Sequence, residues 1–254
     1  MASPHNSRQR TRLDEFLVGQ GLYVSRSRAR DAIGRGAVSI DGAVAAKAGQ
    51  PVSASCDVSI DDPARTYVSR AALKLIAALD HFDLDPAGCS CLDVGASTGG
   101  FTQVLLERGA AHVTAIDVGH DQMDGHLRAD PRVTCIEGLN ARNLIADDLS
   151  GAPADFVVSD VSFISLTLAL PPALGLAASG ARAVLLVKPQ FEAGRAAIGK
   201  GGLLRDAGEG VRIAEKMRDW LDGLPGWRAL GHCPSPVEGG DGNREFLLAG
   251  VKDQ

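Results

Sequence analysis

Short apolar runs and amphipathic stretches alternate along the chain from residue 89 to its end. The amphipathic stretches predict helices at 100–108, 166–177 and 208–221, and a further helix at 69–79 carries Leu73, Ile76 and Leu79 on one face. The apolar runs predict seven strands, at 90–94, 112–116, 132–136, 155–159, 183–187, 228–233 and 245–249. This alternation predicts an α/β fold, a mostly parallel sheet covered by helices on both faces.

The first quarter of the chain has a different pattern. Apolar residues at helical spacing predict helices at 12–20 and 26–35, the second capped by Ser25 and closed by Gly36. Short strands are expected at 37–40 and 43–46, joined by an Asp41-Gly42 turn, and at 58–60. The organisation predicted from these boundaries is a disordered tail at 1–10, a small α+β domain at 11–62, a linker at 63–68 and an α/β domain at 69–254.

Composition narrows the class of protein. No apolar run is long enough for a membrane-spanning helix, and the polar, basic N-terminus lacks the apolar stretch of a secretion signal, so we expect a cytoplasmic protein. The five cysteines form no C-x-x-C pair. We therefore expect reduced thiols and no metal site.

Charge is distributed unevenly along the chain. The net charge is −5, yet residues 1–35 contain seven arginines against three acidic residues. Two interpretations of the arginine-rich helix at 26–35 stay open at this point: a solvated helix face, or an anchor for a polyanion such as RNA.

A glycine-rich turn follows the strand at 90–94, with the sequence Gly95-Ala96-Ser97-Thr98-Gly99-Gly100. Asp117 ends the next strand, where a Rossmann unit places the acid that binds ribose hydroxyls. Three interpretations compete. A dinucleotide site would need a glycine where Ser97 stands. A hydrolase could use Ser97 in G-x-S-x-G with His232 as its base. An S-adenosylmethionine site would use Asp93 at the strand end, the small residues of the turn and Asp117.

Four further polar residues stand at points where strands end or begin. Asp160 and Lys188 end the strands at 155–159 and 183–187, so both should lie at the ligand-binding edge of the sheet. Glu245 reaches the same edge if the last strand runs antiparallel, and Lys74 sits in the otherwise apolar helix at 69–79. Each residue alone has an ordinary structural explanation, as a cap or a solvated side chain. Their convergence on one crevice favours a catalytic role.

Longer motifs give a specific resemblance. The chain contains YVSR at 67–70 leading to Lys74, LDVGASTGGFT at 92–102, SDVSFISL at 159–166, VKPQFE at 187–192 and GNREFLL at 242–248. With these motifs it resembles the TlyA (hemolysin A) family of rRNA 2′-O-methyltransferases. Residues 12–60 resemble an S4 RNA-binding domain, and residues 64–250 resemble an FtsJ-like methyltransferase domain. The loop at 235–243 departs from the family pattern by carrying two acids before Glu245.

The resemblance implies a Rossmann-type domain whose seven-stranded sheet is mostly parallel with the last strand antiparallel, preceded by an α+β S4 domain. It implies S-adenosylmethionine as cofactor and transfer of methyl to a ribose 2′-hydroxyl of cytidine in 16S or 23S rRNA, with rRNA or ribosomal subunits as partner. No membrane or metal partner is expected, and oligomeric state stays open. The alternatives are a serine hydrolase using Ser97 and a membrane-active hemolysin.

The same resemblance assigns roles to individual residues. The catalytic tetrad would be Lys74, Asp160, Lys188 and Glu245. RNA would be bound by Arg12, Arg26, Arg28, Arg30 and Arg35. The cofactor would be bound by Asp93, Gly95, Ala96, Ser97, Thr98, Gly99, Phe101, Asp117, Val118 and Asn140.

Overall fold

The computed structural model describes residues 10–149, 152–206, 208–239 and 242–253. The chain divides into two compact units between Thr66 and Tyr67, a point inside the segment predicted as a linker. Of the tail predicted at 1–10, residues 1–9 lie outside the described part. None of the helices in the described ranges combines the length and the apolar character that a bilayer span requires.

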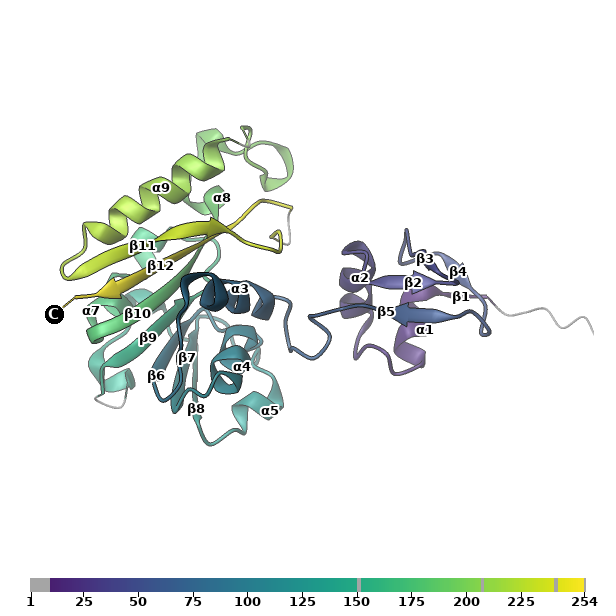
Figure 1. Cartoon of the computed structure of the whole chain (residues 1–254), viewed down its shortest axis with the longest axis horizontal. Helices are drawn as coiled ribbons and strands as arrows, with labels where there is room; N and C mark the ends of the chain where they lie inside the picture. Colours follow the sequence, from purple (N-terminus) through teal and green to yellow (C-terminus); the bar gives the residue numbers. More distant parts are fainter. Residues whose placement is uncertain (1–9, 150–151, 207, 240–241, 254) are drawn as a thin grey trace, which may run out of the picture. The chain divides into compact units, whose positions relative to one another are not determined.

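In the N-terminal unit two helices pack against short antiparallel strands (Figure 1). Helix α1 spans Leu13–Gly19 and α2 spans Arg26–Gly34. The Ser25 hydroxyl accepts a hydrogen bond from the Arg28 amide at 3.3 Å, which confirms the predicted cap. The strands are β1 (Thr11–Arg12), β2 (Val38–Ile40), β3 (Ala43–Val44), β4 (Pro51–Val52) and β5 (Val58–Ile60). They form a sheet in the order β3-β2-β5 and a separate β1-β4 pair.

The C-terminal unit contains a seven-stranded sheet. Its strands are β6 (Ser90–Val94), β7 (His112–Asp117), β8 (Val133–Glu137), β9 (Ala154–Ser159), β10 (Ala177–Val187), β11 (Trp227–Pro234) and β12 (Phe246–Lys252). Their order is β11-β12-β10-β9-β6-β7-β8, which Figure 1 follows across the sheet. Only β12 among these strands is reversed, since it pairs antiparallel with both β10 and β11. The predicted mostly parallel sheet with an antiparallel last strand is confirmed.

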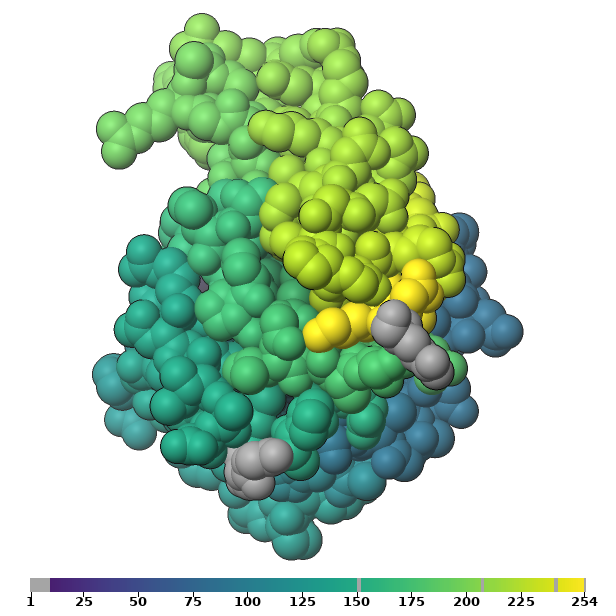
Figure 2. Space-filling model, turned by 90° about the vertical axis from the view of Figure 1, so that its left-hand side faces the viewer, coloured from purple at the N-terminus to yellow at the C-terminus, as the bar shows by residue number. Residues whose placement is uncertain are grey.

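Successive side chains along each strand point to opposite faces of the sheet and pack into two separate hydrophobic cores, as expected for a sheet covered on both faces. Cys91 packs with α3 (Ala72–Phe82), α4 (Gly100–Glu107) and α5 (Gly125–Arg128), whereas its neighbour Leu92 belongs to the core under α6 (Leu166–Ala169), α7 (Pro171–Gly175) and α9 (Glu209–Asp222). A short α8 (Pro189–Glu192) follows β10 and packs against α9. Figure 2 shows the α9 region beside the last residues of the chain, which belong to β12 and its end.

The helix predicted at 166–177 is divided into α6 and α7 and ends at Gly175, before the predicted end. Pro171 and Pro172 interrupt it, because proline lacks the N–H that a continuing helix needs. The chain instead starts the new helix α7 at Pro171. Ala177, predicted as the helix end, already pairs with Ala154 as the first residue of β10. Strand pairing therefore determined the structure there against the local apolar pattern.

Candidate active site

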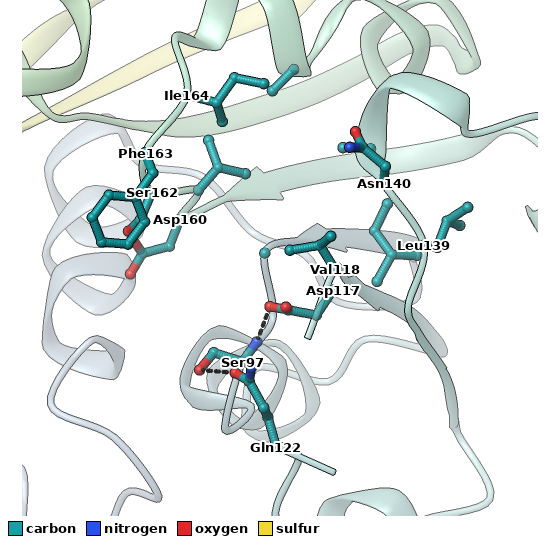
Figure 3. Close-up of a pocket in the computed structure, with 15 residues that line it drawn as sticks. Ser97, Asp117, Val118, Gln122, Leu139, Asn140, Asp160, Ser162, Phe163 and Ile164 are labelled. Atoms are coloured by element: carbon teal, nitrogen blue, oxygen red, sulfur yellow. Dashed lines mark hydrogen bonds between the residues drawn. The ribbon is translucent and has the colours of Figure 1, made fainter. Parts of the chain in front are cut away.

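A cavity of about 450 Å³ opens at the carboxyl ends of β6, β7 and β9 (Figure 3). The connections from β6 and β9 leave this edge on opposite sides of the sheet, since β6 continues toward β7 and β9 toward β10. Such a switch in strand order leaves a crevice, which is where open α/β sheets bind ligands. The cavity lies at the position that the glycine-rich turn predicts.

The turn after β6 is shaped by close approach to the next strand. Gly95 has a φ of +85°, and a Cβ atom there would lie 2.9 Å from the carbonyl oxygen of Asp160. Only glycine combines this conformation with that contact at low cost. Asp117 then fixes the following residues, because its carboxylate accepts from the Ser97 amide at 2.8 Å and from the Gly119 amide at 2.7 Å.

The charge of the cavity restricts its ligand. Two carboxylates, Asp117 and Asp160, lie on its wall, and none of the described lining residues is a lysine or arginine. Its apolar sides come from Ile116, Val118, Leu139 and Ile164. A dinucleotide brings phosphates, which such a wall would repel. A nucleoside that carries positive charge fits both the carboxylates and the apolar sides.

The residues predicted to bind the cofactor fall into three sets. Gly95, Ser97, Asp117, Val118 and Asn140 line the main cavity. Ala96, Thr98 and Phe101 line an adjoining cavity of about 180 Å³, which also borders Gly95 and Ser97. Gly99 lines neither cavity; its φ is +95° and a Cβ there would strike the Leu127 side chain.

Asp93 was predicted to bind the cofactor, but its side chain lies outside the cavities. It is fully buried and borders neither cavity, and it accepts a hydrogen bond from the Thr102 hydroxyl at 2.7 Å. Burial raises the pKa of Asp93 to about 7, and its Oδ1 has no hydrogen-bond partner among the described residues. The hydrogen bond from Thr102 joins the end of β6 to α4, so Asp93 stabilises the glycine-rich turn between them.

Strand register brings three of the four predicted catalytic residues together. Val187 of β10 pairs with Phe246 of β12, so Lys188 and Glu245 are the next residues on neighbouring strands. Leu185 pairs with Ser159 of β9, which sets Asp160 beside the same strand end. Lys74 arrives from α3, a helix that contacts both β10 and β12.

These four side chains form two ion pairs. Lys74 Nζ lies 2.5 Å from Glu245 Oε2, and both side chains are almost completely buried. Lys188 Nζ lies 2.6 Å from Asp160 Oδ1, outside hydrogen-bonding geometry, and donates a hydrogen bond to the Ser162 hydroxyl at 2.6 Å. Two positive and two negative groups thus balance, which is what makes burial of charge tolerable.

Sequence reasoning missed the loop that follows Asp160. Ser162 borders the two cavities described above and a third of about 440 Å³, which Lys188 and Glu245 also line. Phe163 is 90% exposed with a φ of +65°, a strained conformation for an aromatic residue, and its ring lies 5.2 Å from that of Phe191. The motif SDVSFISL contains Ser162 and Phe163, but no feature of the sequence indicates that a phenylalanine will be exposed and strained.

The order of the strands excludes a hydrolase that uses Ser97 with His232 as its base. His232 lies on β11 in a row of paired residues that runs through Leu248, Leu185 and Ser159 to Val94. Four strand spacings of about 4.8 Å separate the two ends of this row by roughly 19 Å. Ser97 follows Val94 by three residues, so His232 is too far away to act as its base.

The Glu245 side chain is expected to set the acid limit of activity. Burial raises the pKa of Glu245 above its ordinary value, although Lys74 favours the charged form. As pH falls through this raised pKa, Glu245 takes up a proton and the ion pair with Lys74 weakens. The rate at saturating substrates should therefore fall at a higher pH than an ordinary glutamate would allow. The measurement is a pH–rate profile of the wild type and Glu245→Gln. An acid limb unchanged in the variant would contradict the assignment.

Two of the five predicted RNA-binding arginines are occupied within the N-terminal unit. Arg28 donates to the carbonyl of Ala64 at 2.9 Å. Arg35 is held by Asp62 at 2.9 Å and by Asp31 at 3.0 Å, with 21% of its side chain exposed. Arg12, Arg26 and Arg30 remain about half exposed and gather on one carboxylate.

Comparison with known proteins agrees with both units. The FtsJ-like methyltransferase model matches residues 67–252, and the S4 domain model matches residues 11–58. The chain is 45% identical over 245 residues to the 16S/23S rRNA (cytidine-2′-O)-methyltransferase TlyA of Mycobacterium tuberculosis, covering 94% of this chain and 89% of that protein. It is 37% identical to Hemolysin A of Brachyspira hyodysenteriae, with 93% and 98% covered. A solved structure of a Streptococcus thermophilus protein assigned as a hemolysin superposes with a TM-score of 0.75 at 37% identity, covering 98% of this chain and 90% of that one.

Proposed function

The chain belongs to the TlyA family of rRNA 2′-O-methyltransferases. We propose that it transfers a methyl group from S-adenosylmethionine to the ribose 2′-hydroxyl of a cytidine in 16S and 23S rRNA, and that the reaction takes place in the cavities described above. One observation carries this proposal. Two ion pairs, one almost completely buried and the other mostly buried, meet beside a cavity whose described wall contains carboxylates and no basic residue. A ribosomal substrate would place the enzyme in the cytoplasm.

The main cavity fits this cofactor. Asp117 would accept hydrogen bonds from ribose hydroxyls while its two backbone donors hold it in place. The apolar sides, including Ile116 and Val118, would flank the adenine, and Asp160 would face the positively charged end. When bound, S-adenosylmethionine supplies an electrophilic methyl group on a cationic sulfur.

The third cavity is the best candidate for the acceptor nucleoside. Lys188 and Glu245 line it, and the paired rings of Phe163 and Phe191 give it an apolar wall. Lys188 borders both this cavity and the small one next to the cofactor turn. It would therefore stand beside the place where the acceptor hydroxyl meets the cofactor.

Lys188 acts in this proposal as a positive charge. Its ion pair with Asp160 and its hydrogen bond to Ser162 fix the ammonium group at the junction of the cavities. The ribose oxygen would displace S-adenosylhomocysteine from the methyl group, and its proton would pass to water. A fixed cation there stabilises the negative charge that develops on the oxygen during this step. Glu245 and Lys74 hold the neighbouring wall, and Asp160 orients Lys188. Positioning of the hydroxyl against the methyl group supplies much of the remaining rate.

Methylation of isolated ribosomal subunits tests the proposal. The protein is incubated with tritiated S-adenosylmethionine and with small or large subunits from a strain that lacks this gene, and labelled nucleosides are identified by mass spectrometry. We expect label in 2′-O-methylcytidine from both subunits. Label from one subunit would narrow the substrate. No label from either, despite measurable cofactor binding, would overturn the proposed reaction.

A further inference from the structure

A fully buried carboxylate lies under three surface arginines in the N-terminal unit. Asp14 of α1 is 0% exposed, yet its side chain contacts Arg12, Arg26 and Arg30. The closest approaches are 3.1 Å to Arg12, 3.1 Å to Arg26 and 2.7 Å to Arg30. These guanidinium groups hold the pKa of Asp14 far below its usual range, so the carboxylate stays charged.

All three arginines bind Asp14 through the same atom. Each donates from its Nε atom, at 3.1 Å for Arg12, 3.3 Å for Arg26 and 2.7 Å for Arg30. Arg12 and Arg26 also donate to Asp14 from Nη2, at 3.4 Å and 3.1 Å. A guanidinium has five N–H donors, so each group keeps donors for another acceptor. The side chains stay 47%, 44% and 52% exposed. Asp14 therefore fixes their direction without covering them.

The arginines come from separate places in the chain. Arg12 ends β1, whereas Arg26 and Arg30 lie one turn apart on α2. Glu15, whose side chain is 40% exposed, forms an ion pair with Arg26, with 2.9 Å between Arg26 Nη1 and Glu15 Oε1. Three cations against these two acids leave the cluster positive. Without a common partner, three long side chains would each lose conformational freedom on binding an anion.

We propose that Asp14 is a positioning residue that turns Arg12, Arg26 and Arg30 into one preorganised receptor for the phosphates of the RNA backbone. The inference rests on the proposed RNA-binding role of this unit. Ordering the arginines before binding reduces the entropy lost on binding, which is how preorganisation raises affinity. If Asp14 only neutralised charge, removing its charge would instead strengthen RNA binding.

The test measures binding of the full chain to in vitro transcribed 16S rRNA over a series of salt concentrations. Asp14→Asn removes one negative charge under the arginines, and Asp57→Asn removes one from an exposed position of the same unit that touches none of them. We expect Asp14→Asn to bind about tenfold more weakly, with a shallower salt dependence because fewer phosphates are engaged. Asp57→Asn should bind as well as the wild type or slightly better. Equal affinity of the two variants would overturn the inference.

A surface variant guards against unfolding of the unit by Asp14→Asn. Arg30→Lys keeps the charge on a half-exposed side chain but loses the planar Nε contact with Asp14. We expect it to bind RNA nearly as weakly as Arg30→Gln. Wild-type affinity of Arg30→Lys would show that charge alone suffices and would overturn the inference.

A triple variant separates this inference from the proposed function. With Arg12, Arg26 and Arg30 all replaced by Gln, retained wild-type affinity would reject both the RNA-binding role of this face and the inference that depends on it. Lost affinity in the triple variant, with full affinity in Asp14→Asn and Arg30→Lys, would reject the positioning role of Asp14 alone.

Discussion

Replacing Lys188 by methionine is expected to abolish methyl transfer while leaving cofactor binding intact. Methionine keeps most of the length of the side chain but removes the charge that pairs with Asp160 at 2.6 Å and the donor to Ser162. Removing a fixed group that stabilises a developing negative charge costs about 10²–10³-fold in rate. The loss here should reach the upper end, because Asp160 is also left without its partner. Single-turnover transfer to ribosomal subunits measures the chemical step, and isothermal titration with S-adenosylmethionine measures binding.

An exposed lysine supplies the matched control for this experiment. Lys216 lies on α9 and lines none of the three cavities, so Lys216→Met should transfer methyl at the wild-type rate. If Lys188→Met retained more than about a tenth of wild-type activity, the electrostatic role assigned to Lys188 would be wrong. A parallel loss of cofactor affinity would instead place Lys188 in the cofactor site.

Removing residues 1–66 is expected to impair RNA binding far more than cofactor binding. The N-terminal unit has its own core around Leu13, Leu17 and Ile33, and the C-terminal unit keeps its two cores intact when the chain is cut there. The truncation removes the arginine cluster of Arg12, Arg26 and Arg30. Three charge-assisted contacts at about 1.5 kcal/mol each correspond to a loss of affinity on the order of 10³-fold.

Two measurements on the truncated protein separate the outcomes. The affinity for S-adenosylmethionine should stay within a few-fold of the full chain, and the apparent KM for ribosomal subunits should rise with the lost RNA affinity. Thermal unfolding with and without cofactor checks that the remaining unit is folded. Unchanged RNA affinity would contradict the division of labour between the units.

Much of the fold was predictable because the apolar runs that form parallel strands are buried on both faces. The strand at 90–94 was predicted with its exact bounds, and the other six strands within a few residues except at the start of β10. That exception, like the break at Pro171, shows the limit of local patterns. An apolar stretch beside two prolines suits a helix or a strand, and pairing with β9 decided between them.

The site shows the same division between local and distant information. The sequence by itself determined the glycine-rich turn, the position of Asp117 at the end of β7 and the identity of the four charged residues, because short motifs of neighbouring residues mark strand ends and turns. Tertiary structure alone decided that Lys74 and Glu245 touch, since 171 residues separate them in sequence. It also buried Asp93 beneath the turn and divided the five arginines into two occupied internally and three gathered on Asp14. These outcomes depend on distances and burial between remote residues, which no local pattern of hydrophobicity or charge contains.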